Sequence, residues 1–345
     1  MTPGTRFRGV VDAVAAVALL LAVGMAATAC ASTTPEPTSG PGPATAVLDD
    51  LDPTPVDAPQ APALPVTVES ADGVPVTITD TSRIVAVDQN GTIGETIFAL
   101  GLGDNLVGRD TATSFPAAAD IPNVTPGGHS LNAEAILALS PTVVLTDTSI
   151  GPRAVQLQLR EAGIPVVFLD PERTLDAVDD QIEAIAAALG VPESGRALAE
   201  RTRSEIDRAI ADVPESNDPP SIAFLYQRGS AVSLLGGPGS GADELITAIG
   251  GVDAGTASGL TQEYTQVTSE ALITAAPDVI LMMTGGLDSV DGVDGLVTLP
   301  GIAQTPAGKN RRVLDMDDSV LLSFGPSTGR VIEALATAYY GSDGA

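Results

Sequence analysis

Several residue types are scarce in this chain of 345 residues. It contains one histidine, one cysteine, no tryptophan and only 3% aromatic side chains. Because Cys30 is the only cysteine, no disulfide can form within the chain. With His129 as the only histidine, a zinc or manganese site built from several imidazoles is disfavoured. The few aromatic rings also argue against a platform on which sugars or bases would stack.

Basic side chains are scarce as well. The chain has 16 lysines and arginines against 44 aspartates and glutamates, which gives a formal net charge of −28. A surface this acidic repels phosphate backbones, so the sequence argues against nucleic-acid binding. The acidity favours solubility but says little about the fold.

The first thirty residues resemble an export signal. Arg6 and Arg8 precede an apolar run over residues 10–27, which stops at "ATAC". This pattern predicts a lipoprotein signal peptide over residues 1–29, with Cys30 as the lipidated residue. The lipid would anchor the mature protein to the outer face of the cell membrane. A transmembrane anchor, or a secreted protein with an incidental cysteine, is the alternative.

The remaining chain divides by composition. Residues 30–65 are rich in proline and threonine and poor in large apolar side chains, which predicts a disordered tether. Residues 191–214 have apolar or alanine positions at every third or fourth residue, which indicates a helix of about 28 Å for about 19 residues. We expect this helix to connect an N-terminal lobe (66–190) to a C-terminal lobe (215–345).

Short hydrophobic runs alternate with helical patterns in both lobes. The runs in the first lobe are "RIVAV" (83–87), "TVVLTD" (142–147) and "IPVVFLD" (164–170), and those in the second are "SIAFLY" (221–226) and "DVILMM" (278–283). Continuous apolar strands separated by helices are typical of parallel sheets covered on both faces. The sequence therefore predicts an α/β protein.

One segment occurs twice. When "LNAEAILALSPTVVLT" is set above "VTSEALITAAPDVILM", Glu134 aligns with Glu270 and Pro141 with Pro277. Both offsets are 136 residues, from 134 to 270 and from 141 to 277. Each lobe is therefore expected to contain a glutamate-bearing helix that a proline ends and a buried strand follows.

Taken together, these motifs resemble the class III substrate-binding proteins of bacterial ABC importers for siderophores, haem and cobalamin. The similarity extends over "TITDTSRIVAV", "GETIFALGLGDNLVGRD", "LNAEAILALSPTVVLTD" and "VLDMDDSVLLSFGP". It implies the type III periplasmic-binding-protein fold, in which one long rigid helix joins two α/β lobes. It also implies that Glu134 and Glu270 dock to arginines of the permease dimer, a task that suits carboxylates because arginine binds them bidentately.

Two stretches resemble the haem-binding, HmuT-type lipoproteins of this class more specifically. They are "PGGHSLNAEAI", which contains His129, and "FLYQRGSAVSLLGGPGSG", which contains Tyr226 and Arg228. The resemblance implies that the transported ligand is ferric haem (Fe³⁺ protoporphyrin IX), with His129 and Tyr226 as its axial ligands, one from each lobe.

This assignment is chemically reasonable. Ferric iron is a hard acid, and both tyrosinate and histidine are known axial ligands of haem. Strand alternation places Tyr226 and Arg228 on one face, where a fixed cation would favour the phenolate. Tyr264, shortly before the second glutamate-bearing helix, is a further candidate for the cleft.

Other functions remain open at this stage. A ferric-siderophore or cobalamin receptor of the same fold is the main alternative, although only Arg109, Arg153, Arg228 and Arg330 are candidates for binding an anionic chelate. A secreted hydrolase is a remote one, since the chain has no GxSxG nucleophile motif and Ser130 merely adjoins His129. We expect a receptor that catalyses no reaction.

Overall fold

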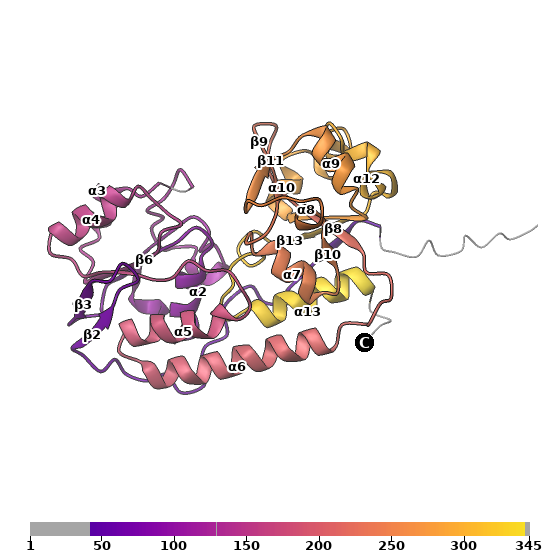
Figure 1. The fold of residues 1–345 in the computed structure, drawn as a ribbon. Coiled ribbons are helices and arrows are strands. Elements are labelled where there is room, and N and C mark those ends of the chain that lie inside the picture. Colours follow the sequence, from indigo (N-terminus) through magenta and orange to yellow (C-terminus); the bar gives the residue numbers. More distant parts are fainter. Residues whose placement is uncertain (1–41, 129, 342–345) are drawn as a thin grey trace, which may run out of the picture. The chain divides into compact units, whose positions relative to one another are not determined.

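The computed structural model describes residues 42–128 and 130–341. Two sheets form the basis of its architecture (Figure 1). The expected signal peptide, Cys30 and His129 lie outside the described residues.

The N-terminal sheet is parallel throughout. Its strand order is β5 (Leu106–Arg109), β4 (Ile84–Val87), β6 (Val143–Thr146) and β7 (Val166–Phe168). Strands β4, β6 and β7 are buried along their whole length, as their continuous apolar runs predict. The helices that alternate with these strands are α2 (Thr92–Ala99), α3 (Ala133–Ala138), α4 (Arg153–Glu161) and α5 (Ala177–Ala188). A separate antiparallel pair precedes the sheet, β2 (Val66–Glu69) with β3 (Pro75–Ile78).

The C-terminal sheet is mixed. Its parallel part contains β1 (Ala44–Ala46), β13 (Val313–Met316), β12 (Val279–Met283), β8 (Ser221–Arg228) and β10 (Val252–Asp253). Strands β9 (Val232–Gly236) and β11 (Tyr264–Gln266) extend it in antiparallel fashion beyond β8. Its helices include α7 (Ala242–Ala248), α8 (Ala254–Ala257), α9 (Ser269–Ala275), α10 (Thr284–Asp288), α11 (Gly292–Leu296) and α12 (Pro306–Asn310). The α/β class with mainly parallel sheets is thus confirmed.

Helix α6 (Pro192–Ala211) is the longest described helix and follows closely the range predicted for it. It packs against α5, which follows the N-terminal sheet, and against α13 (Thr328–Tyr340), which follows the C-terminal sheet (Figure 1). Its buried stripe includes Leu198, Thr202 and Ile206. Within the described part of the chain, no helix is both long enough and apolar enough to cross a membrane.

A buried hydrogen bond joins the two halves next to these helices. Glu95 on α2 accepts a hydrogen bond from the backbone N–H of Ser327, directly before α13, at 2.6 Å. Burial raises the pKa of Glu95 above its ordinary value, and the hydrogen bonds from Ser327 and Ser323 oppose this shift. The loop before α13 is therefore tied to the first half of the chain.

The sequence repeat extends to the ends of its two helices. The side chains of Asn132 and Thr268 cap α3 and α9 by accepting from the backbone three residues later. After the helices, Ser140 and Ala276 both adopt positive φ angles, 47° and 43°. Each pair has the 136-residue offset of the sequence repeat, so the two helices begin and end in the same way.

The structure corrects the expected tether over residues 42–65, a segment that we call the strap. Strand β1 pairs in parallel with β13, and Ala46 within it is buried. Farther along, the backbone N–H of Val56 donates to Ala99 O at 2.8 Å, and Arg201 on α6 donates to two strap carbonyls. The composition misled because a few apolar side chains, among them Leu48, Leu51 and Val56, together with backbone hydrogen bonds suffice to hold a segment of this length.

Candidate functional site

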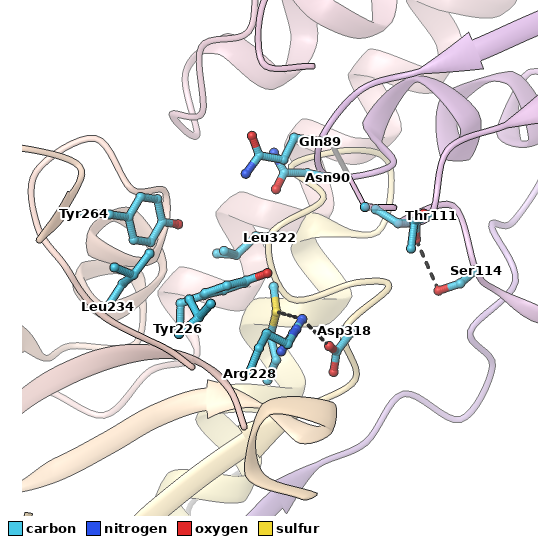
Figure 2. Close-up of a pocket in the computed structure, with 14 residues that line it drawn as sticks. Gln89, Asn90, Thr111, Ser114, Tyr226, Arg228, Leu234, Tyr264, Asp318 and Leu322 are labelled. Atoms are coloured by element: carbon cyan, nitrogen blue, oxygen red, sulfur yellow. Dashed lines mark hydrogen bonds and ion pairs between the residues drawn. The ribbon is translucent and has the colours of Figure 1, made fainter. Parts of the chain in front are cut away.

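A cavity of about 540 Å³ lies where the two halves of the chain face each other. Its first wall consists of loops that follow β4 and β5, and its second wall comes from β8, β9, β11 and the ends of β12 and β13 (Figure 2). The first wall contains Gln89, Asn90, Thr111, Ala112, Ser114 and Gly128, and the second contains Tyr226, Arg228, Val232, Leu234, Tyr264, Met283, Asp318 and Leu322. A cavity of roughly 300–1,000 Å³ suits a small molecule or cofactor.

Tyr226 and Arg228 lie together on the second wall. Both side chains are half-buried and line the cavity, whereas Gln227 between them is buried on the other face of β8. Strand alternation produces this arrangement, as the sequence predicts. Among the described residues, the Tyr226 hydroxyl has no hydrogen-bond partner, and Figure 2 shows it pointing into the space between the walls.

Arg228 contacts the ring of Tyr226 rather than its hydroxyl. The guanidinium carbon lies 4.6 Å from the ring centroid, and Nη2 donates to Asp318 Oδ1 at 2.6 Å. Asp318 is in turn held by the backbone N–H of Gly285 at 2.7 Å. The same Nη2 contacts the Met283 sulfur at 3.4 Å. Asp318 therefore holds a cation over the face of the tyrosine, a favourable geometry for cation–π attraction.

The second tyrosine of the cavity differs from Tyr226 in its chemistry. The Tyr264 hydroxyl donates to Ser240 O at 3.2 Å, and burial raises the pKa of Tyr264 to about 12. The two tyrosine rings meet edge to face, with their centroids 6.4 Å apart. Tyr264 is thus a neutral phenol, whose apolar ring faces the cavity while its hydroxyl is already satisfied.

Buried carboxyl groups order the loops of the first wall. Asp88, directly after β4, accepts hydrogen bonds from the backbone N–H groups of Asn90, Thr92 and Ile93. Asp110 follows β5 and accepts from the backbone of Asp88 at 3.0 Å. Burial, together with the negative charge of Asp88, raises the pKa of Asp110 to about 7. These bonds fix the backbone that presents Asn90 to the cavity.

A third carboxyl at the same sheet edge is also buried. Asp147 follows β6, and its Oδ1 accepts hydrogen bonds from the backbone N–H and the hydroxyl of Ser149. Burial and the nearby Asp88 raise the pKa of Asp147 to about 6, while the Arg173 cation opposes this shift. The carboxyl groups of Asp88, Asp110 and Asp147 therefore form one acidic cluster at the ends of three neighbouring strands.

The loop that contains His129 reaches this cavity. Gly128 lines the first wall, and Ser130 forms an isolated parallel bridge with Gly151. His129 itself lies outside the described residues, so its expected role as a ligand stays a prediction. The expectation that Tyr264 lines the cleft is confirmed.

Among the arginines that the sequence offers for anion binding, only Arg228 lines this cavity. Arg109 donates to Ala118 O, Arg153 forms an ion pair with Asp72, and Arg330 binds the strap at Asp50 O. Sequence reasoning missed Asp318, which follows strand β13 within the motif "VLDMDDSV". Its position just beyond a strand end was the available signal.

Sequence reasoning also missed Arg173. When the amide of Asn90 turns its oxygen toward Arg173, it accepts hydrogen bonds from that guanidinium. The positive charge of Arg173 also lowers the pKa of Tyr264, against the larger effect of burial. Arg173 therefore stands close to both walls.

The two glutamates of the repeat lie away from the cavity lining. Glu134 is in the first turn of α3 and Glu270 is in the first turn of α9, and both are exposed. Within the described residues, neither carboxylate has an ion-pair partner. Both are therefore free to meet a partner from solution.

Known proteins share this architecture. The family model described as "Periplasmic binding protein" matches residues 84–320. The crystal structure of the haem-binding protein HmuT has a TM-score of 0.82 and 42% sequence identity, covering 86% of this chain and 96% of that one. HmuT has also been solved with a histidine, a tyrosine or an arginine replaced by another residue, the tyrosine and arginine being two positions apart.

Curated proteins of other description are similar too. An uncharacterized ABC transporter substrate-binding lipoprotein of Bacillus subtilis, YvrC, is 27% identical over 287 residues, which is 80% of this chain and 86% of YvrC. A cobalamin-binding protein of Halobacterium salinarum is 26% identical over 286 residues, or 81% of this chain and 74% of that protein. The proteins named here are binding proteins.

Proposed function

The chain belongs to the periplasmic binding protein family, and from this premise we propose that it is an extracytoplasmic receptor that binds ferric haem and delivers it to an ABC permease for haem and iron uptake. The observation that carries this proposal is Tyr226, whose hydroxyl points into the cavity with no partner among the described residues. HmuT, 42% identical, is named as a haem-binding protein, which supports the choice of ligand.

Tyr226 would ligate the ferric iron as tyrosinate, and His129 would complete the coordination from the other half of the chain. Arg228, which lies over the ring of Tyr226, would place a positive charge beside the iron-bound tyrosinate. The solved HmuT variants support the inclusion of these three residue types. Apolar side chains such as Leu234 and Leu322 would cover the porphyrin faces.

The remaining assignments belong to the same proposal. Residues 66–190 and 215–345 would be the two lobes, joined by residues 191–214, with Glu134 and Glu270 docking to the permease dimer. Cys30 would carry the lipid that holds the receptor at the outer face of the cell membrane, as the description of YvrC as a lipoprotein supports.

Cobalamin is the second candidate ligand, because curated relatives of 26–27% identity are named as cobalamin-binding or vitamin B12-binding proteins. A titration separates the two. Purified protein lacking residues 1–30 is titrated with hemin, and with cyanocobalamin in parallel, while the Soret and charge-transfer regions are followed. A saturable one-to-one spectral change with hemin, altered in Tyr226→Ala, is expected. Binding of cyanocobalamin with no change in the hemin spectrum would overturn the proposal.

A further inference from the structure

Two exposed apolar side chains occupy equivalent positions in the repeat. Leu137 on α3 is 39% exposed, and Ile273 on α9 is 50% exposed. Leu137 follows Glu134 by three residues, and Ile273 follows Glu270 by three residues. The repeat therefore preserves a pair made of one carboxylate and one large apolar side chain. We call Glu134 with Leu137, and Glu270 with Ile273, the docking pairs.

Helix geometry places the two members of each pair side by side. Residues three apart in a helix lie on the same face, about 5–6 Å apart at their Cβ atoms. Because α3 and α9 share the same type of N-cap and the same left-handed ending, they present their pairs in the same way. Both helices lie on the side of the folded unit that is opposite α6 (Figure 1). A single partner could therefore contact both pairs at once.

The chemistry of the pairs indicates what kind of partner fits. Large apolar side chains gain free energy when a partner removes them from water, and a neighbouring carboxylate is best met by an arginine fork. Two equivalent sites match a partner with two-fold symmetry. A second copy of this chain would instead meet each pair with a predominantly acidic surface, since the formal net charge is −28.

We propose that Leu137 and Ile273 are contact residues for a two-fold symmetric membrane permease, which presents an arginine beside an apolar pocket to each docking pair. This inference rests on the proposed function and adds to it the apolar half of the interface. The carboxylates orient the encounter through their charge, and the apolar side chains slow dissociation once the receptor has docked.

The test replaces the apolar residues in the full-length chain in its native host. Initial uptake of iron-labelled hemin is measured at low hemin concentration for Leu137→Ser, Ile273→Ser and the double variant. The matched controls are Leu157→Ser on α4 and Ile210→Ser on α6, whose side chains are also 39% exposed but lie outside the repeat. Hemin affinity of each purified variant is measured in parallel.

We expect the single variants to take up hemin about three-fold more slowly and the double variant about ten-fold, since partly burying two such side chains changes affinity by this order. Hemin affinity stays at the wild-type value, and the controls keep normal uptake. If the double variant behaves like Leu157→Ser, the apolar contacts are refuted.

Two further outcomes separate the possible failures. If wild-type protein binds no hemin, the proposed function fails before the docking question arises. If the wild-type protein sediments as a dimer and the double variant as a monomer, the docking pairs serve self-association and the inference is overturned. A third result would be a fall in uptake in the double variant Glu134→Ala, Glu270→Ala while the apolar double variant keeps normal uptake. In that case the carboxylates alone make the docking contacts, and the inference is likewise overturned.

Discussion

Two valines of the strap distinguish a packed segment from a loose tether. Val56 is 9% exposed and belongs to the main hydrophobic core, whereas Val47 in the same segment is 70% exposed. Replacing Val56 by alanine removes two methyl groups' worth of burial and leaves a small cavity, so the free energy of unfolding should fall by about 2 kcal/mol. Val47→Ala should change it by less than about 0.5 kcal/mol, as for other exposed positions.

Urea unfolding of the protein lacking residues 1–30 measures this difference. With a slope of about 3 kcal/mol/M for a chain of this size, the Val56→Ala midpoint should lie about 0.5–0.7 M below that of Val47→Ala. The backbone hydrogen bond from residue 56 to Ala99 O survives both substitutions, so the comparison isolates the side chain. Equal midpoints for the two variants would refute the packing of the strap and would favour the disordered tether that the composition predicts.

Further predictions concern the acidic cluster and the support of Arg228. Asp147→Asn should raise the free energy of unfolding at pH 7.5 by on the order of 1 kcal/mol, and by much less near pH 4. The reason is that burial raises the pKa of Asp147 from 3.8 to about 6 in the folded wild type. The wild type therefore loses stability from this group as the pH rises from 4 to 6, and denaturant unfolding at several pH values would show it; a pH-independent difference would contradict the assignment. Asp318→Ala should weaken hemin binding about three-fold, since Arg228 then loses the partner that holds it over Tyr226. Arg228→Ala should weaken it more, and the opposite order in a hemin titration would contradict the positioning role of Asp318.

The sequence predicts most of the architecture because burial leaves a strong pattern in it. Strands such as β4, β6 and β12 are continuous apolar runs. The segments between the strands have apolar residues at helical spacing. Strand alternation also suffices to place Tyr226 beside Arg228, since both belong to β8. These features depend only on neighbours in the sequence.

Features that depend on distant contacts were missed. Asp318 is 90 residues from Arg228, so nothing local in the sequence joins them. The strap has few large apolar residues, yet its backbone pairs with β13, some 270 residues away. The hydroxyl of Tyr264 is satisfied by Ser240 O, a contact that arises only when the loop before α7 folds over β11. In each case tertiary structure supplied the partner.

Ligation of ferric haem by Tyr226 can be tested by comparing two single-hydroxyl variants. The one-to-one hemin complexes of Tyr226→Phe and Tyr264→Phe are examined by absorbance in the charge-transfer region and by electron paramagnetic resonance. Each variant removes one hydroxyl from the same cavity. We expect that Tyr226→Phe loses the tyrosinate signature while Tyr264→Phe keeps it. A tyrosinate signature that survives in Tyr226→Phe would show that Tyr226 does not ligate the iron.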